Sequence, residues 1–427
     1  MSLRVLHIFA PNYRLRFTGP VIQWRYYFNK WSEPGISHFV LDISDSKILP
    51  AAEAFNFELT GAHQVLRKSE RATWVFDLIR SLTRLRGSYD LLHVHVLWWG
   101  SLLLGPWANW RRLPVLYESV LLGSDTPSGI RQERLGGLKL KLLKQYTGIL
   151  AISDFLAEDY LANGFKTDQV HLLENSVDTG LFHPAANNKE KHALRAKYHL
   201  PAESTILIFV GSLIHRKGFD TLVQAFIQAC QQGSDLFLLA VGPASKSENP
   251  SLDENFIQGL KQEIETAQLG SKVRFTGLIQ DRDALAELYR TADLFVFPSR
   301  NEGLPSVLLE AMASGLVPVV SDLPVLRNVI HQGVNGVKVP VEDVPALSDA
   351  IQQLSRDPSR QAELASYAVE SYQSLYLKAH YPLEFMVGVI NNFGGFYKTE
   401  FYFHEARMNG AQIEAPCVNL SEYNTTI

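Results

Sequence analysis

The chain has 427 residues, of which 46% are hydrophobic, 20% charged and 11% aromatic. This composition is typical of a globular protein and excludes disordered, collagen-like and low-complexity classes for most of the chain. The length suggests two or three domains. Only Cys230 and Cys417 are present, far apart, which argues against a disulfide framework and a structural zinc site. The formal net charge of -4 gives no reason to expect a nucleic-acid partner.

Charge is distributed unevenly along the chain. Residues 1–184 carry 20 Lys and Arg against 17 Asp and Glu, whereas residues 185–427 carry 20 against 27. Two interpretations stay open. The difference is chance scatter, or the first half meets an anionic partner such as a phospholipid surface or a phosphorylated acceptor.

The sequence predicts neither a secretory leader nor a membrane span. Met1–Arg4 runs directly into a strand-like stretch, Val5–Phe9, with no small-residue cleavage site. The longest uncharged run, Leu91–Trp110, is interrupted by histidines, glycines and a proline, which favours a buried strand followed by a helix. We therefore expect a cytoplasmic protein, either free or at the inner face of a membrane.

Short apolar runs alternate with helical patterns through both halves of the chain, as expected of buried parallel strands joined by helices. The predicted strands of the first half are Val5–Phe9, His38–Ile43, Leu91–Val96, Val115–Tyr117, Ile149–Ile152 and Val170–Leu173. Those of the second half are Ile206–Val210, Leu236–Val241, Val273–Phe275, Leu294–Phe297 and Val317–Val320. The fold class is therefore α/β, with two doubly wound parallel-sheet domains.

The polar, turn-prone stretch around Phe182–Lys191 marks the predicted boundary between the domains. We expect a first domain over residues 1–184 and a second over residues 185–374. A helix over residues 375–394 follows, and a polar, aromatic tail over residues 395–427 has no predicted role.

Glycines and cations follow several predicted strands, where ligands bind in open α/β sheets. The G-x-G-x-x-G fingerprint of dinucleotide-binding proteins is absent after the first strand, although Gly19 stands where a loop meets a helix. Gly211 ends a second-half strand and precedes Arg216 and Lys217, which suit a diphosphate. The alternatives are that Arg216 and Lys217 are solvated loop charges and that Gly19 belongs to an ordinary turn before a helix.

Two glutamates lie eight residues apart around a helix start. Glu302 stands in a polar loop, and Glu310 lies on a short, otherwise apolar helix. Because a buried glutamate needs a partner, the pair suits two carboxylates that bind separate diols of one extended ligand. The alternative is a loop glutamate and a helix glutamate paired with some arginine.

Asp281 and Asp283 form a D-x-D string, a spacing that binds a metal in some other proteins. Here they open a helix, and Asp283 fits an N-terminal cap. We therefore expect no metal and no cofactor.

Taken together, these motifs resemble the retaining glycosyltransferases of the GT-B fold, in the GT4-type "glycosyl transferases group 1" family. The signature is E-x7-E, Glu302 and Glu310, within Pro298–Gly315. Accompanying motifs are Gly211…Arg216-Lys217-Gly218, Phe275-Thr276-Gly277, Ala311–Val320 and Asn175–Pro184. The resemblance implies two Rossmann-like domains that face a central cleft, with a nucleoside-diphosphate sugar bound by the second and an acceptor by the first.

The resemblance also assigns roles. Lys217 and Arg216 would neutralise the diphosphate, Glu302 would contact the transferred sugar, and Glu310 would hold the ribose diol. The remaining donor contacts would come from Gly19, Gly211, Gly277, Gly303 and Leu304, with backbone at Gly277–Asp281 meeting the base. The residues over 375–394 would cross back onto the first domain.

Two departures from the family stand out. Ser212 replaces an arginine that often follows the glycine, so one diphosphate contact is missing or comes from Arg216. The usual acceptor-side histidine after the strand at Val115–Tyr117 is replaced by Glu118. The acceptor-side candidates are Glu118 and His95, which shares a strand face with His93. The alternative is that both histidines are structural.

The predicted function is retaining, metal-independent transfer of a hexosyl unit to a glycan or lipid-linked acceptor, in polysaccharide or glycolipid biosynthesis. A nucleotide-sugar epimerase and a non-catalytic nucleotide-sugar-binding module are the alternatives. A basic cluster leaves two interpretations open, which are a solvated helix face and peripheral association with an anionic membrane. It consists of Arg131, Arg134, Lys139, Lys141 and Lys144, with Arg14, Arg16 and Arg25 flanking the Gly19 loop.

Overall fold

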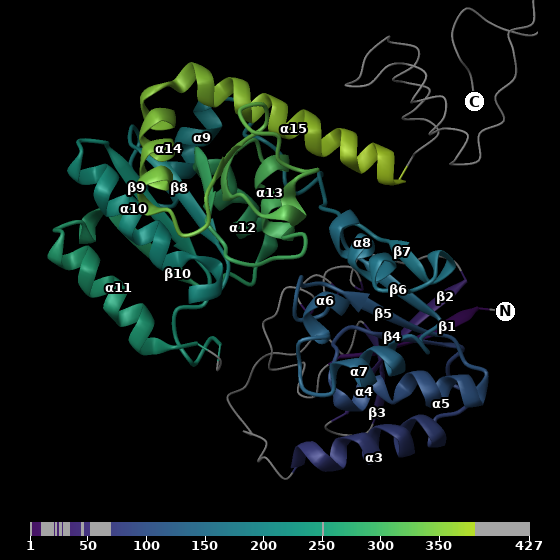
Figure 1. The fold of residues 1–427 in the computed structure, drawn as a ribbon. Helices are drawn as coiled ribbons and strands as arrows, with labels where there is room; N and C mark the ends of the chain where they lie inside the picture. Colours follow the sequence, from purple (N-terminus) through teal and green to yellow (C-terminus); the bar gives the residue numbers. More distant parts are fainter. Residues whose placement is uncertain are drawn as a thin grey trace, which may run out of the picture.

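The computed structural model describes residues 2–9, 35–43, 47–51, 70–249 and 252–380, together with Val21, Trp24 and Phe28. These residues form two α/β domains joined by the segment near residue 180 (Figure 1). The predicted Gly19 loop, the residues over 381–394 and the tail lie outside the described part of the chain.

The first domain is built on a seven-stranded sheet with the order β3-β2-β1-β4-β5-β6-β7. All pairs are parallel except β2 with β3. The strand order reverses between β1 and β4, which makes that pair the switch point of the sheet. The strands are β1 Leu3–Ile8, β2 Ile36–Asp42, β3 Lys47–Pro50, β4 Leu91–Val94, β5 Val115–Ser119, β6 Gly148–Ala151 and β7 Val170–Leu172.

The second domain has a six-stranded, fully parallel sheet with the order β10-β9-β8-β11-β12-β13, whose switch point lies between β8 and β11. Its central strands are buried throughout, as continuous apolar sequence requires between two helical layers. The strands are β8 Thr205–Val210, β9 Leu236–Val241, β10 Val273–Gly277, β11 Leu294–Phe297, β12 Val317–Ser321 and β13 Val337–Val339.

Helices connect successive strands in both domains (Figure 1). Those of the first domain are α3 Glu70–Arg84, α4 Trp99–Leu102, α5 Leu104–Arg111, α6 Pro127–Ile130, α7 Gly136–Leu143 and α8 Asp154–Ala162. Those of the second are α9 Asn188–Lys197, α10 Phe219–Gln231, α11 Glu254–Thr266, α12 Arg282–Thr291, α13 Ser306–Ala313, α14 Val344–Arg356 and α15 Pro358–His380.

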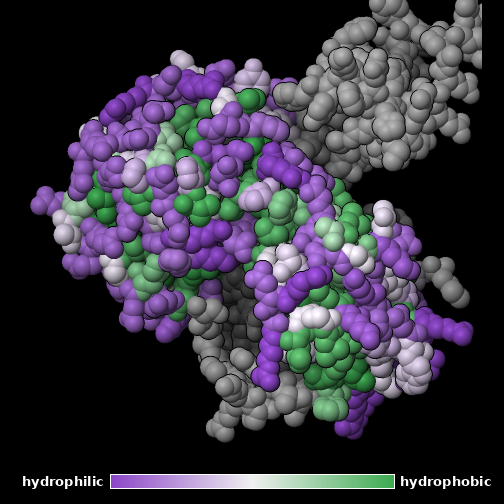
Figure 2. Space-filling model, in the orientation of Figure 1, coloured by the Kyte–Doolittle hydropathy of each residue, from purple (hydrophilic) through white to green (hydrophobic). Residues whose placement is uncertain are grey.

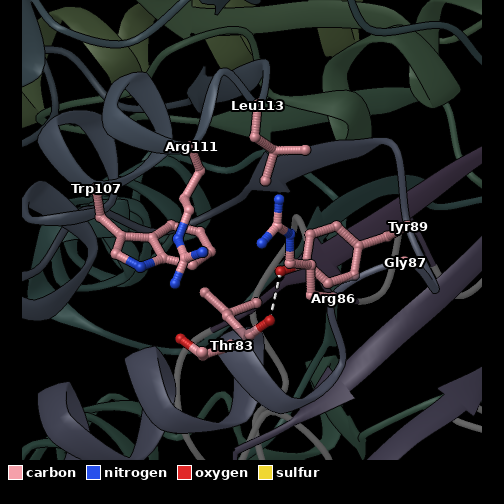
Figure 3. Close-up of a pocket in the computed structure, with 8 residues that line it drawn as sticks. Thr83, Arg86, Gly87, Tyr89, Trp107, Arg111 and Leu113 are labelled. Atoms are coloured by element: carbon pink, nitrogen blue, oxygen red, sulfur yellow. Dashed lines mark hydrogen bonds between the residues drawn. The ribbon is translucent and has the colours of Figure 1, made fainter.

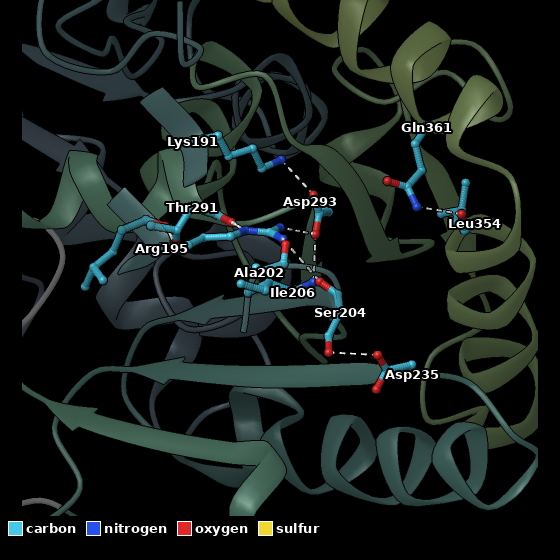
Figure 4. Close-up of polar contacts among 11 residues, drawn as sticks. Lys191, Arg195, Ala202, Ser204, Ile206, Asp235, Thr291, Asp293, Leu354 and Gln361 are labelled. Atoms are coloured by element: carbon cyan, nitrogen blue, oxygen red, sulfur yellow. Dashed lines mark hydrogen bonds and ion pairs between the residues drawn. The ribbon is translucent and has the colours of Figure 1, made fainter. Parts of the chain in front are cut away.

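A buried ion pair anchors α9, the helix that opens the second domain (Figure 4). Arg195 is 5% exposed, and its Nη2 lies 2.7 Å from Asp293 Oδ2. The same Asp293 accepts from Lys191 Nζ at 2.6 Å and from the backbone N–H of Ile206 at 2.7 Å. The start of β11 is thereby tied to α9 and to β8, which fixes the two strands that flank the switch point.

The connection between the domains is packed rather than exposed. Val177 and Phe182 belong to the hydrophobic core of the second domain, as do Ile152 and Leu156 from the first. The Tyr372 hydroxyl on α15 donates to the Val177 carbonyl and accepts from its N–H, both at 2.9 Å. The end of the long helix therefore holds the linking segment in place.

The structure confirms the strands predicted from apolar runs and corrects several details. The uncharged run Leu91–Trp110 forms β4, α4 and α5, and no helix in the described ranges is long and apolar enough to span a membrane. Strands β3 and β13 were not predicted. The last helix of the described residues begins at Pro358, 17 residues before the predicted start at residue 375.

Candidate active site

Two loops meet at the switch point of the second sheet. One follows β8 and spans Gly211–Gly218, and the other follows β11 and spans Pro298–Pro305. Because β8 and β11 are neighbouring parallel strands, both loops leave the same edge of the sheet. The backbone N–H of Arg300 donates to the Arg216 carbonyl at 2.9 Å, which joins the loops directly.

Glu302 is the centre of this junction. Its Oε1 lies 2.7 Å from Lys217 Nζ and 3.2 Å from Arg216 Nη1, and it accepts a hydrogen bond from Ser299 Oγ at 2.7 Å. The Glu302 residue is 6% exposed, so its charge depends on these donors. The structure thus brings together the three residues predicted to be catalytic and adds Ser299, which the sequence alone did not single out.

Lys217 is held in a partly desolvated position. Its ammonium lies 4.8 Å from the centre of the Phe297 ring, and burial lowers the pKa of Lys217 while neighbouring Glu302 opposes that shift. The following Gly218 has φ 70°, and a Cβ there would stand 1.8 Å from the Pro298 carbonyl oxygen. Only glycine allows the two loops to approach this closely.

Glu310 is also buried, at 4% exposure, and it has partners of its own. Arg282 Nη2 donates to its Oε1 at 3.0 Å, and the Tyr289 hydroxyl donates to its Oε2 at 3.1 Å. Burial raises the pKa of Glu310, and the nearby Arg282 opposes the shift. In this structure Glu310 is therefore paired with an arginine, the alternative that its sequence context left open, and a ribose would have to replace or share that partner.

The end of β10 forms a third part of the junction. Gly277 has φ 72°, and the Glu248 carboxylate accepts from the backbone N–H groups of Leu278 at 3.0 Å and Ala244 at 2.8 Å. Burial raises the pKa of Glu248, but these hydrogen bonds outweigh burial and leave the pKa lowered. Nothing in the sequence around Glu248 indicated this role, since it lies in an ordinary polar stretch.

The first domain reaches the same loops. The backbone N–H of Leu122 lies 3.4 Å from the Glu302 carbonyl, and Asn301 Nδ2 donates to the Leu122 carbonyl at 2.8 Å. A Cβ on Gly303 would stand 2.1 Å from the Val120 carbonyl oxygen, so glycine permits the contact between the domains. Asn175, in the linking segment, donates from Nδ2 to the Leu304 carbonyl at 2.6 Å.

The acceptor-side candidates, His95 and Glu118, contact each other. His95 Nδ1 lies 2.5 Å from Glu118 Oε2, and Trp24 Nε1 donates to the same oxygen at 2.8 Å. Burial raises the pKa of Glu118, while the nearby His93 opposes the shift. Glu118 is 5% exposed and His95 is 1% exposed, so neither presents a free group to a substrate in this structure.

The D-x-D string is a helix cap, but the capping residue differs from the prediction. Asp281, not Asp283, is the N-cap of α12, and its side chain accepts from the N–H groups of Asp283 and Ala284. Asp283 lies in the first turn, where its charge favours the helix dipole.

A pocket in the first domain lies away from this junction. It is lined by residues from the ends of α3 and α5 and from the starts of the neighbouring strands, including Arg86, Trp107 and Arg111 (Figure 3). The Tyr89 hydroxyl beside it donates to the Leu82 carbonyl at 2.7 Å. The pocket stands at the amino-terminal edge of the sheet and is separate from the Glu302 loops.

Two α/β domains that meet at a cation-lined, carboxylate-bearing switch point define a GT-B glycosyltransferase. The family described as "Glycosyl transferases group 1" matches residues 190–371, and the family described as "Glycosyl transferase 4-like domain" matches residues 49–176. Over these two ranges, one in each domain, the chain is similar to glycosyltransferases of these two families.

Individual relatives are similar to this chain at about 30% identity over part of their length. Mannosylfructose-phosphate synthase of Agrobacterium fabrum is 32% identical over 39% of this chain and 35% of that enzyme. D-inositol 3-phosphate glycosyltransferase of Xylanimonas cellulosilytica is 29% identical over 67% of this chain and 68% of that one. The chain therefore spans about a third of the length of the first enzyme and about two thirds of the second.

Solved structures show the same fold. Sucrose-phosphate synthase from Thermosynechococcus elongatus has a TM-score of 0.64 at 20% identity, covering 87% of this chain and 95% of that chain. HepE from Anabaena, solved in complex with UDP-glucose, has a TM-score of 0.65 at 16% identity with the same coverage.

Proposed function

We propose that this glycosyltransferase moves a hexosyl unit from a nucleoside-diphosphate sugar, with retention of configuration, to a glycan or lipid-linked acceptor. The observation that carries the proposal is the convergence of Lys217 and Arg216 on Glu302 at the switch point of the second sheet. Two cations beside one carboxylate leave an excess positive charge where a donor diphosphate would lie.

The proposed chemistry places each group. The bond between the sugar and its diphosphate breaks, a bond from the sugar to an acceptor hydroxyl oxygen forms, and the hydroxyl proton passes to the released diphosphate. Negative charge grows on the leaving diphosphate, where Lys217 and Arg216 would stabilise it together with the N-terminal amides of α10, which begins directly after Gly218. Glu302 would turn from these cations to the hydroxyls of the sugar, and Glu310 would exchange Arg282 for the ribose diol.

The relatives guide the choice of donor. HepE was solved with UDP-glucose, and one relative is named as a lipopolysaccharide core biosynthesis mannosyltransferase, from Rhizobium leguminosarum. UDP-glucose and a mannose nucleotide are therefore the first donors to test. We propose no cofactor and no metal at the diphosphate.

Transfer is tested by incubating the protein with each nucleotide sugar and a lipid and glycan extract, then measuring free nucleoside diphosphate and the anomeric configuration of the product. Acceptor-dependent release with retained configuration supports the proposal. Release with an altered sugar and no acceptor indicates an epimerase, and binding without release indicates a non-catalytic module; either result contradicts transfer.

A surface on the first domain suits an anionic membrane. Hydrophobic residues gather on it around α4 and α7 (Figure 2). Trp99, Leu103, Leu135 and Leu138 are between 41% and 57% exposed, and the basic cluster of Arg131, Arg134, Lys139, Lys141 and Lys144 lies on the same segments. Leu140 and Leu143 cover the core side of α7, whereas Leu135 and Leu138 face away from the core.

Both segments follow carboxyl ends of strands, α4 after β4 and α7 after β5, and the β5 loop also touches Gly303. Membrane contact through this surface would bring the junction of the domains near the lipid headgroups. Each exposed lysine or arginine near anionic lipid contributes about 1 kcal/mol.

Sedimentation with anionic and neutral vesicles at low and high salt tests the membrane contact. We expect salt-sensitive binding to anionic vesicles that is lost when Leu135 and Leu138 are changed to Ser and Lys141 to Glu. A matched variant with Lys189, exposed on α9, changed to Glu should bind normally. Absence of binding at low salt would contradict the membrane contact and leave the transferase proposal intact.

A further inference from the structure

Four histidines gather in the first domain, away from the predicted donor site. His7 on β1 is the register partner of His93 on β4, and His95 follows two residues later on the same face. His95 is held to β1 by its backbone N–H, which donates to the Ile8 carbonyl at 3.0 Å. His7, His93 and His95 are 1%, 5% and 1% exposed, beneath Trp24 and Phe28.

We propose that His7, His93 and His95 form a binding site for one divalent transition-metal ion, of which Zn²⁺ fits best. One ring nitrogen from each histidine lies within 4.8 Å of those of the other two. The site stands at the β1/β4 switch point, where ligands of open α/β sheets bind. Three histidines with a fourth position for water or carboxylate is an established zinc ligand set.

The hydrogen bonds behind the histidines match those of a metal site. His95 Nδ1 lies 2.5 Å from Glu118 Oε2, and His7 Nε2 lies 2.9 Å from His38 Nδ1. Glu118 accepts from His95 Nδ1, which leaves His95 Nε2 as an acceptor on the side of the cluster, where it shares a hydrogen bond with His7 Nδ1 that a bound ion would replace. Those two inner nitrogens, His7 Nδ1 and His95 Nε2, are 2.9 Å apart.

The buried ring nitrogen of His93 is a second observation that indicates a ligand in this cluster. His93 Nε2 is buried, lies 3.6 Å from Glu118 Oε2 and has no hydrogen-bond partner among the described residues. A buried nitrogen in this state points to an ion or a water that completes it.

The geometry needs only local adjustment. Zinc–nitrogen bonds of about 2.0–2.1 Å in a tetrahedron place ligand nitrogens about 3.3 Å apart. His7 Nδ1 and His95 Nε2 would separate by a few tenths of an ångström, and His93 would rotate toward them. The bound ion would tie β1 to β4 and, through Glu118, to β5, whose following loop touches the Glu302 loop.

Metal retention by the full-length, tag-free chain tests the site. The protein is loaded with Zn²⁺, passed through gel filtration and assayed for metal, and Co²⁺ is added separately as a spectroscopic probe. We expect one retained Zn²⁺ per chain and the visible absorption of four-coordinate, nitrogen-bound Co²⁺. No retained Zn²⁺ and no such absorption would overturn the proposal and leave a water as the partner of His93.

Variants locate the ion. His93→Phe should abolish retention, and Glu118→Gln should weaken Zn²⁺ affinity about 10–100-fold while leaving the three ligands in place. The exposed histidine of β7, in His171→Gln, serves as the control and should retain metal normally. Unchanged affinity in both His93→Phe and Glu118→Gln would place the ion elsewhere and overturn the proposal.

Discussion

Replacing Glu302 by Gln removes one negative charge between two cations, and its consequences can be worked out from the contacts. Glu302 Oε1 forms ion pairs with Lys217 and Arg216 and accepts a hydrogen bond from Ser299. Removing one partner of a buried ion pair costs about 3–5 kcal/mol. The Arg216 side chain is 38% exposed and can be solvated without Glu302, whereas the Lys217 side chain is 16% exposed and cannot. We therefore expect the free energy of unfolding to fall by an amount near the lower end of that range.

The affinity for nucleotide should be kept or increased in this variant, although the stability of the free protein should fall. In the Glu302→Gln variant Lys217 and Arg216 have no carboxylate between them, and the diphosphate of a nucleotide supplies the missing charge. We therefore expect the variant to bind nucleoside diphosphate at least as tightly as the wild type and to be stabilised more by it. Turnover should fall, because the contact with the transferred sugar is lost.

Calorimetric titration with UDP and with the best donor, followed by urea unfolding with and without nucleotide, measures these quantities. Glu263→Gln, an exposed position on α11, removes the same charge and should change neither affinity nor stability. If Glu302→Gln weakens UDP binding as much as Lys217→Ala does, the carboxylate is not a competitor of the diphosphate and the reasoning is refuted.

Four further predictions concern other contacts. Asp293→Asn should lower the free energy of unfolding by about 3–5 kcal/mol in urea, because buried Arg195 loses its partner, while Lys189→Ala should not; an unchanged midpoint would disprove the anchoring role. Glu310→Gln should weaken nucleotide binding more than turnover in steady-state kinetics, and the reverse pattern would remove Glu310 from the ribose. Arg4 holds the pKa of Asp90 at about 2, below its usual value of 3.8, so the stabilisation by this pair should be present above pH 3.8 and lost as the pH falls toward 2 in acid unfolding; Asp90→Asn should lack that part of the pH dependence. Adding Mg²⁺ or Mn²⁺ to chelator-treated protein should not raise the transfer rate, and a rise would return Asp281 and Asp283 to consideration.

Much of the fold could be predicted because buried parallel strands need continuous apolar sequence. Runs such as Ile206–Val210 and Leu236–Val241 are short and continuously apolar, which is typical of a strand buried on both faces. Strand β3, with sequence KILP, was missed because an edge strand of four residues ending in proline has little apolar signal. Strand β13 was missed for its length of three residues.

The candidate site was predictable by residue type but not by contact. The sequence suggested separate roles for Lys217 and Glu302, which stand 85 positions apart. Lys217 and Glu302 meet because β8 and β11 are neighbours in the sheet, and the order of strands cannot be predicted from the sequence of either strand. The same limit applies to Arg282 as partner of Glu310.

The histidine cluster shows a different limit. The two cysteines gave no zinc site, and Asp281 and Asp283 fitted a helix start better than a metal site. His7 and His93 lie 86 positions apart in the sequence and meet only because β4 pairs with β1. The spacing of His93 and His95 was visible in the sequence, but their third partner was not.

The assignment of the donor diphosphate to Lys217 is tested most directly by comparing nucleoside diphosphate with nucleoside monophosphate in the wild type and in Lys217→Ala. A hydrogen bond to a charged group contributes about 1.5–3 kcal/mol, or roughly 10–150-fold in affinity. We predict that the wild type prefers UDP to UMP, or the corresponding pair of its own base, by a factor in that range, and that most of the preference disappears in Lys217→Ala. An equal preference in both proteins would show that Lys217 does not contact the diphosphate and would contradict the account.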